Sequence, residues 1–269
     1  MELSVLFKTS TPVIGVVHLL PLPASARWQG SLRAVVDRAV QEAVALASGG
    51  VNGIIVENFF DAPFTKGAVD PAVVSAMTVV ITRLRQLVTV PIGVNVLRND
   101  AHSGLAIAAC TGAEFIRVNV LTGVMATDQG VIEGDAHGLM RYRRELGVDV
   151  KIFADVLVKH AVPLGTAAGS AMADAVADTI HRGLADAVIV SGGATGQVPT
   201  RQDLTHAKAA AGETPVLVGS GATVDNIPKL LQSADGVIVS SSLKRGGQIE
   251  QPVDPNRVGQ FMEAILSSL

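Results

Sequence analysis

The feature that most constrains the fold is a strict alternation of short apolar runs with longer segments of helical periodicity. The apolar runs are rich in Val, Ile and Leu, and eight of them occur, at residues 13–18, 53–57, 92–96, 115–118, 150–154, 187–190, 216–218 and 237–239. Segments with helical spacing lie between and after them, at 31–47, 71–87, 101–111, 136–146, 170–182, 201–211, 224–232 and 255–266. Strands that alternate with helices form a parallel sheet, and eight such units favour a closed (β/α)8 barrel.

Length and composition agree with this architecture. A (β/α)8 barrel typically has about 250 residues, so we expect residues 1–269 to form a single barrel domain. Apolar residues make up 48% of the chain and aromatic residues only 3%, as is typical of parallel strands covered by helices. An open doubly wound sheet would carry a Gly-x-Gly-x-x-Gly turn after the first run, and none is present. The one cysteine, Cys110, is predicted to be a small buried residue.

Charge and hydropathy exclude several classes of partner. The formal net charge of −3 gives no basic surface for nucleic acid. Residues 1–11 lack the apolar centre of a secretory signal, and the apolar segment 72–81 is too short to span a bilayer. We therefore expect a cytoplasmic protein without a transmembrane segment, a prediction compatible with peripheral contact with a membrane. Oligomerisation is typical of such barrels, so a homo-oligomer is expected.

Two carboxylates stand at the ends of predicted strands, where barrel enzymes place their functional groups. Glu57 and Asp155 each follow four apolar residues. They are candidates for general acid/base catalysis or metal binding, with pKa values set by burial and neighbours. The alternative is that each only forms an ion pair with a neighbouring arginine or lysine.

Lys159, His18 and His160 follow the same strand ends. Lys159 lies four residues beyond Asp155, which favours an electrostatic role over a Schiff base. His18 is interpreted as a packed, hydrogen-bonded residue at the site. The histidines and carboxylates together would also suit a divalent metal, although no His-x-x-x-His spacing supports one.

Polar residues on neighbouring runs are predicted to bind the substrate. Asn95, Arg117 and Asn119 present hydrogen-bond donors that suit the hydroxyls or a carboxylate of a substrate. Asn95 is also predicted to be a catalytic residue, with Glu57, Asp155 and Lys159. His18, Asn58, Arg98 and Ser191 complete the substrate-binding set. The alternative is a hydrogen-bonded layer that closes the top of the barrel.

The last two predicted strands end in turns of small residues. Gly219, Ser220 and Gly221 follow one strand, and Ser240 and Ser241 follow the next. Such turns let backbone N–H groups approach an anion, and barrels commonly hold a phosphate at this position. The alternative is that they only form tight turns and helix caps. Lys244 and Arg245, just beyond, are interpreted as solvated loop charges rather than an extension of the phosphate site.

Several longer motifs resemble the BtpA/SgcQ family over residues 13–261. They are Val-Val-His-Leu-Leu-Pro-Leu-Pro at 16–23, Gly-Ile-Ile-Val-Glu-Asn at 53–58, Gly-Val-Asn-Val-Leu-Arg-Asn-Asp at 93–100, Phe-Ile-Arg-Val-Asn at 115–119, Thr-Asp-Gln-Gly at 127–130, Ala-Asp-Val-Leu-Val-Lys-His-Ala at 154–161 and Val-Gly-Ser-Gly at 218–221. The turn at 191–196 departs from the Thr/Gly turn of that family.

The resemblance implies a TIM barrel similar to ribulose-phosphate-binding barrels. One branch of the family is similar to a protein needed for photosystem I accumulation, and another to proteins encoded beside sugar-phosphate genes. The leading hypothesis is an enzyme of the isomerase, lyase or hydrolase type that acts on a phosphorylated sugar or nucleoside. The alternatives are a non-catalytic photosystem I biogenesis or stability factor, and a sensor that binds a phosphorylated ligand without turnover. Fold analogy alone does not choose between them.

Overall fold

Eight parallel strands close into a barrel in the computed structural model, which describes residues 1–165, 171–193 and 196–266. Around the barrel the order is β1-β11-β10-β9-β7-β4-β3-β2. The strands are β1 (Val13–His18), β2 (Gly53–Glu57), β3 (Ile92–Asn95), β4 (Phe115–Val118), β7 (Lys151–Val156), β9 (Ala187–Val190), β10 (Val216–Val218) and β11 (Gly236–Val239). The predicted (β/α)8 barrel is therefore confirmed.

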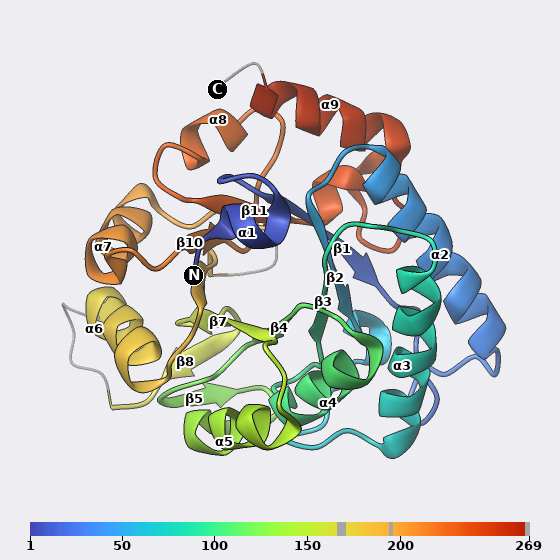
Figure 1. Cartoon of the computed structure of the whole chain (residues 1–269), viewed down its shortest axis with the longest axis horizontal. Coiled ribbons are helices and arrows are strands. Elements are labelled where there is room, and N and C mark those ends of the chain that lie inside the picture. The colour runs from blue at the N-terminus through green and yellow to red at the C-terminus, as the bar shows by residue number, and fades with distance from the viewer. Residues whose placement is uncertain (166–170, 194–195, 267–269) are drawn as a thin grey trace.

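Helices surround the barrel and cover the outer face of its strands (Figure 1). They are α2 (Leu32–Ser48), α3 (Pro71–Arg85), α4 (Ala101–Thr111), α5 (Ala136–Leu146), α6 (Ala171–Ala177), α7 (Arg201–Ala211), α8 (Ile227–Leu230) and α9 (Pro255–Leu266). Side-chain caps fix where several begin: Ser31, Asp70, Asp100 and Thr200 accept bonds from backbone N–H groups of the first turn. Ser170, Ala194 and Thr195, which belong to a predicted helix start and a predicted turn, lie outside the described residues.

Side chains along each strand alternate between the barrel interior and the helix layer. Ile14, Ile55 and Ile238 belong to an inner cluster, whereas Val17 and Ile54 pack with the helices. Phe115 and Phe153 are the largest fully buried side chains, and they stack at 4.8 Å between ring centroids. Gly93 leaves room for the Phe115 ring, since a Cβ there would lie 2.2 Å from it.

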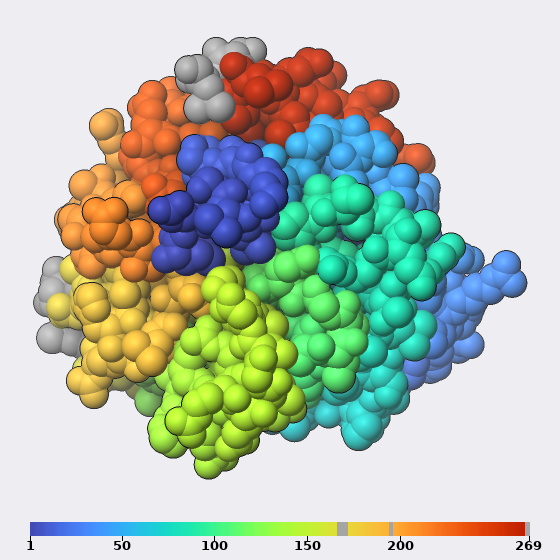
Figure 2. All heavy atoms as spheres, viewed as in Figure 1, coloured from blue at the N-terminus to red at the C-terminus, as the bar shows by residue number. Residues whose placement is uncertain are grey.

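The amino-terminal segment covers one end of the barrel, a feature that the sequence did not predict. Residues 1–11 were interpreted only as a polar leading segment, but Leu3–Phe7 forms helix α1. Leu3 and Phe7 are buried, and Phe7 contacts Phe115 edge to face at 5.6 Å. Figure 2 shows this segment over the middle of the face viewed. Leu3 and Phe7 pack on the inner cluster and close the barrel interior at its amino-terminal end.

A small antiparallel sheet lies outside the barrel order. Its strands are β5 (Val124–Thr127), β6 (Gly130–Glu133) and β8 (Ala161–Pro163), paired in the order β6-β5-β8. The sequence predicted only a polar loop after the fourth barrel strand. Because β5 and β6 follow β4 while β8 follows β7, this sheet ties together two loops at the carboxyl end of the barrel.

Two further observations concern the outer surface. No helix of the described ranges is long and apolar enough to cross a membrane. Cys110, on α4, is exposed, so the prediction that it is a buried residue is wrong. Its helix is rich in alanine on both faces, and apolar periodicity therefore did not define which side faces the core.

Candidate active site

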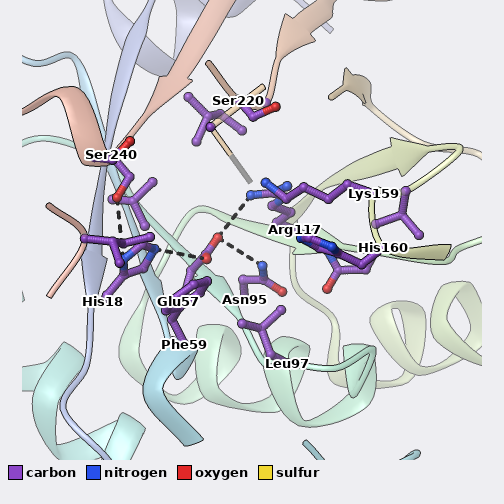
Figure 3. Close-up of a pocket in the computed structure, with 18 of the residues that line it drawn as sticks. His18, Glu57, Phe59, Asn95, Leu97, Arg117, Lys159, His160, Ser220 and Ser240 are labelled. Carbon is purple, nitrogen blue, oxygen red and sulfur yellow. Dashed lines mark hydrogen bonds and ion pairs between the residues drawn. The ribbon is translucent and has the colours of Figure 1, made fainter. Parts of the chain in front are cut away.

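A cavity of about 550 Å³ opens at the carboxyl end of the barrel strands. Its position follows from strand geometry, because the last inward-facing residue of each strand points into this space. The residues that carry chemistry here are His18, Glu57, Asn95, Arg98, Arg117, Asn119, Asp128, Lys159, His160, Ser220, Ser240, Ser241 and Ser242. Figure 3 shows His18, Glu57, Asn95 and Arg117 together at the base of the site.

Strand register places three of these groups in one row. His18 pairs with Glu57 across β1 and β2, and Glu57 pairs with Asn95 across β2 and β3. The Asn95 amide donates to Glu57 Oε1 at 3.0 Å. All three side chains are almost fully buried, so their contacts form in a medium that screens charge weakly.

An ion cluster forms the floor of the cavity. Arg117 donates through Nε and Nη2 to the two carboxylate oxygens of Asp155, at 3.0 and 2.9 Å. Its Nη1 donates to Glu57 Oε1 at 3.1 Å. Asn119 adds a 2.7 Å bond to Asp155 Oδ2. Both carboxylates therefore pair with one guanidinium, and these charge-assisted bonds hold the three side chains in fixed positions at the base of the site.

His18 lies between Glu57 and Ser240. Its Nε2 is 3.6 Å from Glu57 Oε2, and its Nδ1 is 3.5 Å from Ser240 Oγ. The ring stacks on Phe59 with centroids 4.3 Å apart. Burial lowers the pKa of His18 below its ordinary value, against the opposing effect of the Glu57 carboxylate. The imidazole is therefore neutral at physiological pH and able to accept a proton.

Glu57 is held as a carboxylate. Burial alone would raise its pKa, but the contact with His18 and the charge of Arg117 outweigh burial and lower the pKa to about 2. A group with so low a pKa binds a proton too weakly to serve as a general base near neutral pH. Its position instead suits the orientation of His18 and Arg117.

The depressed pKa of Glu57 predicts how stability depends on pH. An unfolded glutamate titrates near about 4.3, so the stabilisation from ionised Glu57 is present above that pH. It is lost as the pH falls toward about 2. We expect Glu57→Gln to be less stable than the native chain at pH 7, and the difference to shrink steadily during acidification. Urea unfolding of both chains at successive pH values measures this difference in the free energy of unfolding. The exposed Glu213→Gln variant is the control, and a pH-independent difference for Glu57→Gln would contradict the assignment.

The loops after β10 and β11 form another wall of the cavity. Gly221 has φ +76°, and a Cβ there would lie 2.5 Å from the backbone nitrogen of Val198. Ser242 Oγ donates to the Ala222 carbonyl at 2.7 Å and joins the two loops. The N–H groups of Gly221, Ala222, Ser241 and Ser242 have no acceptor within the described ranges. The predicted turns thus present unpaired donors to the cavity. The Ser220 hydroxyl is already engaged, since it accepts from Gly192 N and donates to the Gln197 carbonyl.

Some predicted site residues lie outside the cavity lining. Asp155 is behind Arg117, and its side chain is only 1% exposed. Asn58 is buried and fastens the next loop, because its amide oxygen accepts from Leu97 N at 2.7 Å and its amide nitrogen donates to the Leu97 carbonyl. Ser191 Oγ lies beneath Gly219, where an added Cβ would approach it to 2.5 Å.

Lys244 is not a solvated loop charge, as the sequence suggested. It is fully buried, and its Nζ lies 3.2 Å from both carboxylate oxygens of Glu42 on α2. Arg38 donates to the same carboxylate at 2.7 Å. This buried cluster attaches the loop after β11 to α2 and so fixes Ser240 and Ser241. The sequence indicates an ion pair between Arg38 and Glu42, which are four residues apart on one helix. No feature near Lys244 or Glu42 in the sequence indicates that these two residues pair.

The same histidines and carboxylates were considered as candidate ligands of a divalent metal, without a ligand spacing that supports one. Within the described part of the chain, no three His, Cys, Asp or Glu side chains are grouped in a way that could hold a metal ion. Glu57 is paired with His18, Asn95 and Arg117, which occupy the positions that metal ligands would need. A divalent metal stays a prediction of the sequence only.

Fold and site together define a class: a (β/α)8 barrel with a charged, ligand-sized cavity at the carboxyl end of its strands. The chain belongs to the BtpA family, whose model matches residues 9–267. The photosystem I biogenesis protein BtpA of Synechocystis is 66% identical over 269 residues, which cover all of this chain and 93% of that protein. An uncharacterized protein of Thermococcus kodakarensis is 47% identical over 94% of both chains. An uncharacterized mitochondrial protein of Caenorhabditis elegans is 32% identical over 97% of this chain and 96% of that one.

Solved structures agree on the fold. Phosphoribosyl anthranilate isomerase from Thermus thermophilus superposes with a TM-score of 0.55 at 10% identity, covering 96% of this chain and 99% of that one. A native KDPGal structure gives a TM-score of 0.57 at 14% identity, covering 97% of both chains. At this level of identity the likeness establishes a shared barrel architecture and no shared chemistry.

Proposed function

We propose that this protein is an enzyme that acts on a phosphorylated small molecule of the sugar or nucleoside class. The observation that carries the proposal is the joint position of two features in one cavity: the His18–Glu57 pair and the loops with unpaired N–H groups after β10 and β11. The phosphate lies at those loops, and His18 transfers the proton.

Phosphate binding is supported by the backbone of both loops. Gly221, Ala222, Ser241 and Ser242 line one shared cavity, and their N–H groups have no acceptor in the described ranges. Converging backbone donors are the usual way in which barrels hold a phosphate at these two strand ends. The hydrogen bond between the loops, from Ser242 to Ala222, keeps the donors in place before the ligand binds.

Proton transfer is assigned to His18 rather than to Glu57 or Asp155. His18 is neutral and lines the cavity, whereas Glu57 has a pKa of about 2 and Asp155 is occupied by Arg117. Glu57 stabilises the imidazolium that forms when His18 accepts a proton. Arg117 is engaged by Glu57 and Asp155, and it holds the Glu57 carboxylate in position beside His18. This arrangement suits an isomerase, lyase or hydrolase that moves a proton on its substrate.

A second candidate function rests on the 66% identity with the photosystem I biogenesis protein BtpA. A non-catalytic role in biogenesis would make no use of the cavity. Relatives that cover more than nine tenths of this chain occur in Thermococcus kodakarensis and Caenorhabditis elegans, organisms without photosynthesis. The barrel therefore has a use apart from photosystem assembly, and this favours the enzyme. A His18→Ala chain that restores photosystem I in a Synechocystis strain lacking BtpA would favour the non-catalytic role.

A thermal-shift screen tests the phosphate site. We expect at least one compound in a panel of sugar phosphates and nucleotides to raise the melting temperature. A ligand at a hundred times its Kd stabilises by about 2.7 kcal/mol, which corresponds to roughly 5–10 °C for a chain of this size. Ser241→Asp places a carboxylate among the donors and should abolish the shift. Gly221→Asp should do the same, while Gly147→Asp, also at a positive φ but on the exposed end of α5, should keep it. A shift that survives both loop variants would contradict the proposed site.

A further inference from the structure

Two cationic side chains of the cavity belong neither to the ion cluster around Arg117 nor to the loops after β10 and β11. They are Arg98, on the loop after β3, and Lys159, on the loop after β7. In Figure 3, Lys159 and His160 enter the cavity from the side away from Ser240, with Glu57 and Arg117 between. The cavity therefore carries positive charge at a place distinct from the loops after β10 and β11.

The backbone around Arg98 is fixed on both sides. Asn58 holds Leu97 through two hydrogen bonds, of 2.7 and 3.2 Å. Asn99 does the same to Val120, donating to its carbonyl at 3.0 Å and accepting from its N–H at 2.7 Å. A loop held in this way presents its arginine in one position and so suits ligand recognition.

The guanidinium of Arg98 is only partly satisfied. The residue is 9% exposed, yet one hydrogen bond is found for it, from Nη1 to Asp128 at 3.2 Å. The Asp128 side chain is 69% exposed, so water screens that ion pair. Arg98 Nε is buried and has no hydrogen-bonding partner in the described ranges. A buried donor without a partner is costly, and Arg98 also lines the cavity with guanidinium N–H groups for which the described ranges supply no acceptor other than Asp128.

Lys159 lacks a partner more completely. No hydrogen bond or ion pair of its ammonium group is found within the described ranges, although the residue lines the cavity. Burial lowers the pKa of Lys159, and the charges of Arg117 and Arg98 lower it further, while Asp155 and Glu57 act in the opposite direction. Arg98 and Lys159 line the same cavity, so an anion bound there would meet both cations.

Arg117 is not available to bind this anion, because its three nitrogens already donate to Asp155 and Glu57. We propose that Arg98 and Lys159 form a second anion subsite, so that the ligand carries two anionic groups. This inference rests on the proposed function: the phosphate lies at the loops after β10 and β11, and a carboxylate or second phosphate lies at Arg98 and Lys159. The substrate class is narrowed to phosphorylated acids and bisphosphates.

Titration calorimetry of the full chain at constant ionic strength tests the subsite with three probes. Glycerol 3-phosphate has one anionic group, 3-phosphoglycerate adds a carboxylate, and fructose 1,6-bisphosphate adds a second phosphate. We expect one of the two probes with two anionic groups to bind about ten- to a hundredfold more tightly than glycerol 3-phosphate, the factor that one charge-assisted hydrogen bond supplies. The preferred probe identifies the second group.

Two substitutions test whether Arg98 and Lys159 cause the tighter binding of the preferred probe. Lys159→Met and Arg98→Met should bring the preferred probe to within about threefold of glycerol 3-phosphate, whose own affinity should barely change. The exposed Lys229→Met is the control. Lys159→Met removes no hydrogen bond or ion pair found among the described residues and should fold, so it carries the test if Arg98→Met does not fold.

Other outcomes overturn the proposal. Absence of binding by all three probes, equal affinity for them in the native chain, or equal losses for one- and two-anion probes in Lys159→Met would each do so. Failure of the proposed function is recognised separately, because Ser241→Asp would then leave the binding of every probe unchanged. If Lys159→Met weakens the binding of the probes and Ser241→Asp does not, a single anion binds at Arg98 and Lys159.

Discussion

Replacing Arg117 by methionine is expected to lower the free energy of unfolding by about 3–5 kcal/mol, the usual cost of removing one partner from a buried ion pair. The side chain of Arg117 is 5% exposed, and those of Glu57 and Asp155 are 6% and 1% exposed. Methionine fills a similar volume but leaves two carboxylates facing each other without a cation. Their repulsion and the lost solvation together produce the large effect.

Urea unfolding at pH 7 measures the change. Arg141→Met is the matched control: it breaks an ion pair with Glu145 on α5, where both side chains are more than half exposed, and should cost less than about 0.5 kcal/mol. Acidification should narrow the gap between Arg117→Met and the native chain, because protonation removes the repulsion. An Arg117→Met chain as stable as the control variant would show that the floor of the cavity is not a buried ion cluster.

Replacing His18 by glutamine is expected to lower kcat by about 10²- to 10⁴-fold, the range that general acid–base catalysis contributes. The reaction is the turnover of the phosphorylated compound found in the thermal-shift screen. Binding should change little, because the phosphate is held by the loops after β10 and β11 and not by His18. In the native enzyme, kcat should fall as the pH drops through the lowered pKa of His18, since the base must be neutral.

His102→Gln is the matched control for this effect. His102 lies on α4, pairs with Asp135 at 3.3 Å and is about half exposed, so its loss should leave kcat unchanged. Glu57→Gln should lower kcat without removing the proton-accepting group, and its pH profile should shift toward lower pH because the imidazolium loses its counter-ion. Full activity of His18→Gln would reject the assigned proton transfer.

The alternation of apolar runs was sufficient to predict the barrel. Five strands and four helices were bounded residue for residue, including 115–118 and 136–146. Periodicity was informative here because each parallel strand is buried on both faces and each helix on one. It failed at 224–232, where only Ile227–Leu230 is α-helical. Pro228 inside that segment leaves little room for a longer helix.

The candidate site was located by a simple rule, that polar residues following barrel strands face one end. The rule brought His18, Glu57 and Arg117 together correctly, as the cavity shows. It could not tell the residues that touch a ligand from those that support them. Asp155 and Asn58 have the same sequence signal as Glu57, and only their hydrogen bonds to Arg117 and Leu97 reveal a positioning role.

Long-range pairings were beyond the reach of the sequence. Lys244 and Glu42 are 202 positions apart, and nothing near either of them indicates that the ammonium group is fully buried. The packing of Phe7 against the stacked pair Phe115 and Phe153 depends likewise on space left by Gly53, where an added Cβ would lie 2.7 Å from the Phe7 ring. Such contacts depend on the closed barrel, which brings both ends of the chain together.

The crystal structure of the protein with its tightest-binding phosphorylated compound tests the central claim most directly. The account predicts phosphate density between the loops after β10 and β11, with oxygens about 2.7–3.2 Å from the N–H groups of Gly221, Ala222, Ser241 and Ser242. The remainder of the ligand would extend over His18. Phosphate density confined to Arg98 and Lys159, or found outside the cavity with both loops empty, would contradict it.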